Sequence, residues 1–168
     1  MRTVAVASII AGAVVAAALL SACDSTPADS KQTLKALSAT RVITVPPPGA
    51  TEIGSAHDPG STSSITGHDP VLEKIFATAQ SVGDLVSYYE RTYPQYRFTQ
   101  NFAPLPQKQL AGRDGWADVT VNISTGEPNL AFANLHVKLS PAPSTATTYV
   151  VVVVSGHEPT TTATASTS

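Results

Sequence analysis

Residues 81–94 read SVGDLVSYYERTYP, and this stretch is the clearest structural signal in the chain. Ser81 followed by Asp84 matches the capping box that begins many α-helices. Apolar side chains then recur at helical spacing, and Pro94 disfavours helical geometry in the residue before it. The sequence therefore predicts an amphipathic helix from Ser81 to Tyr93. Its apolar stripe consists of Val82, Leu85, Val86, Tyr89 and Tyr93.

Three segments before this helix have strand character. Arg41–Val45 and Thr51–Ser55 are short runs separated by prolines and a glycine, and a loop rich in turn-forming residues extends from Ser55 to Asp69. Val71–Ala77 is ambiguous, because Asp69-Pro70 would also suit the start of a helix. We favour a strand there, since the segment is short and its side chains alternate.

Four further strand candidates follow the helix. Tyr96–Phe102, Trp116–Ile123 and Leu130–Leu139 alternate between apolar and polar residues, and turn-forming residues separate them, as at Gly112–Gly115. Tyr149–Val154 is apolar on both faces, which is typical of an interior strand. The sequence thus predicts an α+β domain: an antiparallel sheet of about five or six strands with one amphipathic helix packed on a face.

The amino terminus has the features of an export signal. Met1-Arg2 gives a short positive start, and the following run to Leu20 is almost entirely apolar. The alternative of an uncleaved membrane helix is disfavoured by the next residues. Leu20-Ser21-Ala22-Cys23 resembles the lipobox of bacterial lipoproteins, which implies cleavage between Ala22 and Cys23 and lipid attachment to the Cys23 thiol.

This pattern divides the chain into four parts. Residues 1–22 are predicted to be a lipoprotein signal peptide, and residues 23–40, which are polar and rich in Ser, Thr and Ala, a flexible tether. Residues 41–157 are predicted to form the single α+β domain. Residues 158–168 carry no apolar side chain larger than Ala, so we expect a disordered Ser/Thr-rich tail.

Two motifs resemble a known group of proteins. PGATEIGS at residues 48–55 and the Tyr-rich stretch at residues 81–94 are similar to motifs of small secreted lipoproteins of high-GC Gram-positive (actinobacterial) bacteria, most of them uncharacterised. The resemblance implies a strand–helix–strand order and a surface location in the cell envelope. It implies no catalytic residues.

Composition limits the classes of function. The formal net charge is -2 and the basic residues are scattered, which argues against a nucleic-acid partner. The single cysteine, Cys23, excludes an internal disulfide. No motif predicts a cofactor or a catalytic site, so we favour a non-catalytic envelope module that binds the membrane through its lipid and an envelope protein or glycan as partner. The alternatives are a carrier of a lipid or small apolar ligand and a cell-envelope hydrolase.

Two sets of residues are candidates for binding. The first is a repeated tripeptide, His57-Asp58-Pro59 and His68-Asp69-Pro70, whose imidazoles and carboxylates are potential metal ligands. We favour the alternative that the Asp-Pro pairs form turns and that the histidines are solvated. The second is a recognition face on the polar sides of two predicted strands. That face would consist of Trp116, Phe132 and His136. The alternative, which we favour, is that Trp116 and Phe132 are covered by the loop region of Gly49–Asp69.

Overall fold

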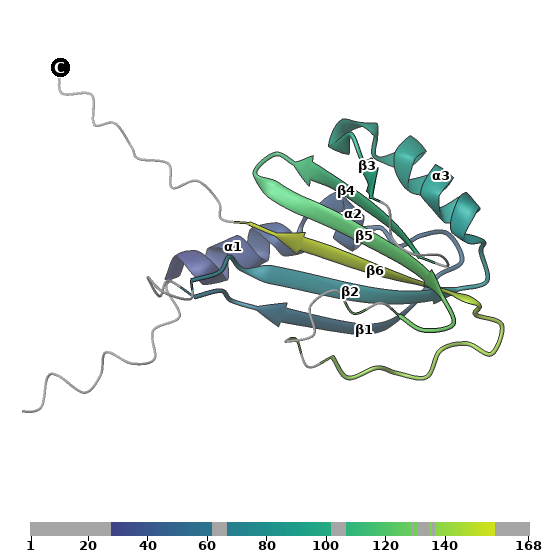
Figure 1. Ribbon diagram of the computed structural model, residues 1–168. Coiled ribbons are helices and arrows are strands. Elements are labelled where there is room, and N and C mark those ends of the chain that lie inside the picture. The colour runs from purple at the N-terminus through teal and green to yellow at the C-terminus, as the bar shows by residue number, and fades with distance from the viewer. Residues whose placement is uncertain are drawn as a thin grey trace, which may run out of the picture.

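The computed structural model describes residues 28–61, 67–101, 107–128, 130, 135 and 137–156, and Figure 1 shows their arrangement. Within these ranges the chain forms one antiparallel sheet and several helices, so the predicted α+β class is confirmed. None of the described helices combines the length and the apolar character needed to cross a membrane. The elements in chain order are α1 (Ala28–Ser38), α2 (Arg41–Thr44), β1 (Thr51–Asp58), β2 (Val71–Thr78), α3 (Val82–Thr92), the 3-10 helix η1 (Pro94–Tyr96), β3 (Thr99–Asn101), β4 (Lys108–Asp114), β5 (Ala117–Thr125) and β6 (Thr148–Ser155).

The last strand among the described residues lies at the centre of the sheet. Six strands follow one another in the order β1-β2-β6-β5-β4-β3, and every neighbouring pair is antiparallel. Strand β6 suits the central position because Val150 to Val154 is apolar at every step, so both of its faces can be buried. The predicted interior strand over Tyr149–Val154 is therefore confirmed.

The two faces of the sheet have different covers, and we call them the helix face and the back face (Figure 1). On the helix face, alternate residues of β5 and β6 form one core with side chains of all three α-helices. On the back face, a smaller core lies beneath a stretch without helix or strand that leads into β6. We call residues 137–147 of this stretch the strap. The back-face core consists of Ile53, Val71, Ile75, Ala77, Val151 and Val153.

Helix α3 begins and ends close to the predicted positions. The Ser81 hydroxyl accepts a hydrogen bond from the Asp84 backbone N–H at 3.2 Å, as the capping box requires. The helix ends at Thr92, before Pro94. Leu85 and Tyr89 are fully buried and belong to the helix-face core, and Val82 and Val86 are partly buried against it.

The amino-terminal part of the domain differs from the prediction. Arg41–Val45 was expected to be a strand, but α2 occupies Arg41–Thr44 and buries Val42 and Ile43 in the helix-face core. Burial of two adjacent β-branched residues in that core outweighs their preference for strands. Residues 28–38 of the expected flexible tether form α1, in which Ser30, Thr33 and Leu37 are buried at helical spacing. Residues 28–38 are therefore part of the described fold and do not form a flexible tether.

Three strands also differ from the prediction. Strand β1 continues to Asp58 because the turn-rich residues after Ser55 pair with β2. Strand β3 begins only at Thr99, since Tyr96 belongs to η1 and Arg97 has a left-handed backbone with φ 49°. Strand β4 was not predicted. Its central Gly112 suggested a turn, but a Cβ atom there would lie 2.6 Å from the Tyr96 carbonyl oxygen, so the glycine is required by close packing.

The strand predicted over Leu130–Leu139 is not present in the described part of that segment. Leu130, Leu135 and residues 137–139 have no strand geometry, and residues 131–134 and 136 lie outside the described residues. Both sides of β5 are already paired, with β4 and with β6, so the alternating residues cannot extend the sheet beside it. Leu135 and Val137 instead pack against the back-face core. The strand predicted over Val71–Ala77 is confirmed as β2.

Candidate functional site

The residues predicted to carry function are distributed over several places. The lipidation and cleavage residues Ala22 and Cys23 lie outside the described residues, as do Phe132 and His136 of the expected recognition face. Trp116 is described, in the turn between β4 and β5. It is partly buried against the helix-face core, and a Cβ atom on Gly156 would lie 3.2 Å from its ring. The ring therefore covers the end of β6 and does not project from a strand face.

The β1–β2 hairpin brings the two His-Asp-Pro tripeptides together. The His68 Nε2 atom lies 3.1 Å from the Asp58 Oδ1 atom, although the two residues belong to different tripeptides. The other histidine and aspartate of the two tripeptides are placed differently. His57 and Asp69 are both exposed, and successive residues of a strand point to opposite faces, so His57 does not share the face of Asp58.

Asp58 holds the neck of the hairpin loop closed. Its Oδ1 atom also accepts a hydrogen bond from the Gly60 backbone N–H at 2.7 Å, which forms an Asx-type turn. Ser61 and His68 exchange two backbone hydrogen bonds of 2.9 and 3.1 Å. Gly60 has φ 80°, and a Cβ atom there would lie 2.7 Å from the Pro70 nitrogen. The repeated tripeptides thus build a closed turn.

The hairpin does not assemble the ligand set considered from the sequence. Within the described ranges, no three His, Cys, Asp or Glu side chains gather closely enough to hold a metal ion. Asp58 and His68 form only a pair, and their side chains remain 35% and 51% exposed. A cation bound there would keep most of its water, so the pair is better suited to closing the loop than to metal binding.

A cavity of about 370 Å³ opens beside the hairpin neck. Most of its lining comes from the hairpin loop, while Ser30 of α1 forms the opposite wall. The lining combines the hydroxyl, imidazole and carboxyl side chains of these elements with two prolines and a glycine. Its lining residues are Ser30, Pro59, Ser61, Gly67, His68, Asp69 and Pro70.

The back face contains a buried acid that the sequence analysis missed. Glu73 of β2 is 0% exposed, and neither of its carboxyl oxygens has a hydrogen-bond partner. Burial raises the pKa of the Glu73 carboxyl above its ordinary value. One signal was available, since Glu73 alternates with Val71 and Ile75 and so shares their face. The sequence could not show that this face of β2 is covered.

A second buried polar group lies on the same face. Asn122 of β5 is 2% exposed, and its Oδ1 atom accepts a hydrogen bond from Gln109 Nε2 at 2.9 Å. The Asn122 Nδ2 atom has no partner. Strand β6 separates Asn122 from β2, and it contributes Val151 and Val153 between them. The back face therefore combines an apolar centre with two incompletely satisfied polar side chains.

Comparisons of the chain with protein-family models, with curated proteins and with solved structures find no match. The resemblance of residues 48–55 and 81–94 to actinobacterial lipoproteins therefore stays a prediction.

The closed hairpin neck leads to a first prediction. We expect Asp58→Ala to speed hydrogen exchange of the Ser61 and His68 amides by about tenfold, because the hydrogen bond from Gly60 to Asp58 and the contact between Asp58 and His68 are both lost. Hydrogen exchange measured by NMR on the full chain checks this. His57→Ala, at the neighbouring exposed position, is the matched control and should leave both amides unchanged. Equal exchange in the two variants would show that Asp58 does not close the loop.

Proposed function

We propose that this protein is a membrane-anchored lipoprotein of the bacterial cell envelope, exported and held by lipid on Cys23. The observation that carries the proposal is the order of the amino-terminal features: a positive start, an apolar run and Leu20-Ser21-Ala22-Cys23. Each buried methylene of an acyl chain contributes about 0.8 kcal/mol, so two or three chains on Cys23 anchor a protein stably.

The proposed anchor places the domain close to the membrane. Helix α1 begins at Ala28, and the chain from Cys23 to Ala28 can span at most roughly 18 Å. The hairpin neck lies at the same end of the domain as the start of α1, since Ser30 and the hairpin residues line one cavity (Figure 1). In this proposal, that end of the sheet faces the lipid headgroups.

We further propose that the domain is a non-catalytic binding module in which α3 packs across the helix face. Full burial of Leu85 and Tyr89 in one core with Val119 and Val121 supports this packing. With the helix face covered and the hairpin end toward the headgroups, partners of the module, such as an envelope protein or glycan, have access to the back face. Residues of the strap, and none of the described helices, pack against the back-face core.

Mass spectrometry of the protein from its membrane tests the anchor. We expect the mature chain to begin at Cys23 and to carry acyl chains on it, and Cys23→Ala to leave an unprocessed precursor with the signal attached. Ser21→Ala keeps a small residue before the cysteine and should be processed like the unaltered chain. An unmodified Cys23 thiol, or cleavage at another bond, would contradict the proposal.

A further inference from the structure

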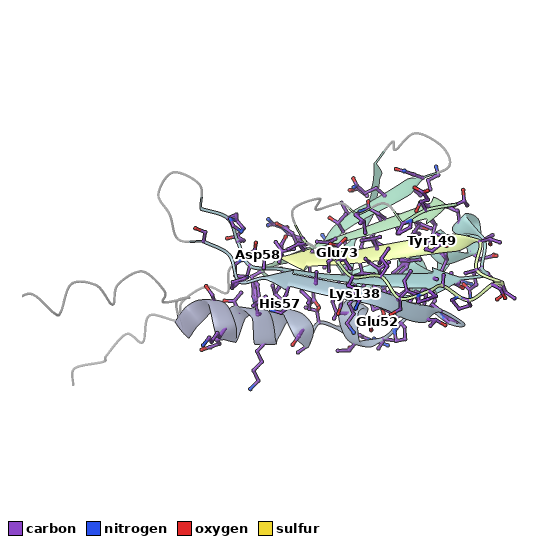
Figure 2. All side chains as sticks on the ribbon, turned by 90° about the horizontal axis from the view of Figure 1, so that it is seen from below. Glu52, His57, Asp58, Glu73, Lys138 and Tyr149 are labelled. Atoms are coloured by element: carbon purple, nitrogen blue, oxygen red, sulfur yellow. The ribbon has the colours of Figure 1, made fainter. Side chains whose placement is uncertain are left out.

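Glu73 lies in the middle of the back face, among apolar side chains. It is paired across the sheet with Ala56 of β1 and with Val153 of β6, and Val71 and Ile75 flank it on its own strand. Figure 2 shows Glu73 between Asp58 at one end of the sheet and Tyr149 at the other. No part of the Glu73 side chain reaches solvent. The carboxyl group therefore lies on an apolar surface of the sheet.

The described elements packed against Glu73 supply no partner for it. The titratable side chains on this side are Asp58 of β1, Lys138 of the strap and Tyr149 of β6, and none of them bonds to either carboxyl oxygen. Asp58 is held by Gly60 and His68, and Lys138 is exposed. Burial is the cause that raises the Glu73 pKa. An acid kept in this setting without a partner is characteristic of a binding position.

The strap that covers this face is weakly fastened. Its contacts with the back-face core come from Val137, Ala142 and Ala146, two of which are the smallest apolar side chains. Val137 and Leu139 also lie close to Gly54 of β1, where a Cβ atom would be 2.9 and 3.0 Å from them. Two backbone hydrogen bonds connect it to the sheet, from Ser140 N–H to the Ile53 carbonyl at 2.6 Å and from Thr147 N–H to the Thr78 carbonyl at 3.0 Å. A segment with few buried contacts and few backbone bonds opens at low free-energy cost.

We propose that the back face around Glu73 is a binding site for a small amphipathic amine, whose ammonium group pairs with Glu73 while its apolar body replaces the strap over Val151 and Val153. A single carboxylate matches a single positive charge, and the surrounding valines and isoleucines match an alkyl body. A metal ion would need more ligands, and the described residues gather no group of three around any position.

This pairing couples binding to protonation. The ammonium group favours the ionised form of Glu73, whereas burial in the free protein favours the protonated form. Binding therefore releases a proton, and the affinity for the amine increases with pH until Glu73 is ionised in the free protein. A neutral alcohol of the same length lacks this dependence, which separates the proposal from simple apolar binding.

Carbon-13 NMR of the full chain, labelled at the glutamate carboxyl carbons and held in non-ionic detergent, tests the site. Glu73 and Glu52 are titrated with pH, alone and with n-hexylammonium chloride or n-hexanol. Glu73→Gln and Glu52→Gln assign the two signals. We expect hexylammonium to lower the Glu73 midpoint by about one pH unit, the result of a tenfold preference for the ionised form. Glu52, which is exposed and paired with Lys74 at 2.8 Å, should not shift.

Each outcome of the titration has a defined meaning. A Glu73 midpoint that does not move with hexylammonium, or that moves equally with hexanol, would overturn the proposal. So would equal shifts at Glu73 and Glu52, which would show nonspecific charge effects.

Hydrogen exchange of the Ser140 and Thr147 amides should accelerate about tenfold with hexylammonium in the unaltered chain and stay constant in Glu73→Gln. Unchanged amides in the unaltered chain would overturn strap displacement. None of these results depends on lipid at Cys23. A failed test of the lipid anchor and a failed test of the Glu73 site can therefore be told apart.

Discussion

Leu85→Ala should lower the free energy of unfolding by about 2–5 kcal/mol, through lost burial and the cavity left in the helix-face core. Leu85 is 0% exposed and lies in the same core as Val119 and Val121. Its truncation therefore removes buried apolar contacts that water does not replace. A typical domain has about 5–15 kcal/mol of stability in total. This single change should therefore shift the urea midpoint strongly or prevent folding at elevated temperature.

The matched control for Leu85→Ala lies on the same helix. Ser87 is exposed, so Ser87→Ala should stay within about 0.5 kcal/mol of the unaltered chain. Glu90→Ala, also at an exposed position, should behave in the same way. Urea unfolding of the three variants, followed by circular dichroism, makes the comparison. If Leu85→Ala unfolds at the midpoint of the unaltered chain, α3 does not stabilise the domain and becomes a candidate for partner contact.

Glu73→Leu should raise the free energy of unfolding by about 1–3 kcal/mol at neutral pH, because a buried carboxyl without a partner is replaced by an apolar side chain. The new side chain lies among Val71, Ile75 and Val153, which form an apolar environment. Few single substitutions stabilise a protein by this amount, so the effect should be easy to recognise. Glu52→Leu, at an exposed position on β1, should give no comparable gain.

The gain from Glu73→Leu should depend on pH in a defined direction. The folded-state pKa of Glu73 is raised above its ordinary value of 4.5, so the folded chain binds this proton more tightly than the unfolded chain. The stability that Glu73 contributes is therefore fully present below about 4.5 and is lost as pH increases through the folded-state pKa. Urea unfolding at pH 4 and pH 8 should show a small difference between the two chains at the lower pH and a larger one at the higher. A difference that is equal at both would show that Glu73 does not titrate with a raised pKa.

Elements stabilised by local signals were predicted well from the sequence. Helix α3 has its own capping residues, its own apolar stripe and a proline that ends it, so no distant contact was needed to recognise it. Strands β5 and β6 carry clear alternating or continuously apolar patterns, and β2 was identified by its length and alternation. The antiparallel α+β class follows from these elements together.

Elements defined by distant contacts were not predicted. Val42 and Ile43 have strand propensity, but the helix-face core accommodates them on α2. The buried side of α1 includes the polar residues Ser30 and Thr33, so the composition of this segment indicated a flexible tether. Gly112 indicated a turn because the sequence does not show the Tyr96 carbonyl that requires a glycine there.

The same division applies to the candidate sites. The lipobox predicted at Leu20–Cys23 rests on the sequence alone, because it is a linear motif and needs no fold to be read. It also supplied the His-Asp-Pro repeat, but only the pairing within the β1–β2 hairpin brought Asp58 to His68 and left His57 on the opposite face of β1. Glu73 depends most on tertiary structure. Alternation along β2 predicts that Glu73 shares a face with Val71 and Ile75. Its burial depends on β1, β6 and the strap, which contact β2 only in the folded protein. The free energy of a buried charge is set by everything that surrounds it, and that environment exists only in the folded protein.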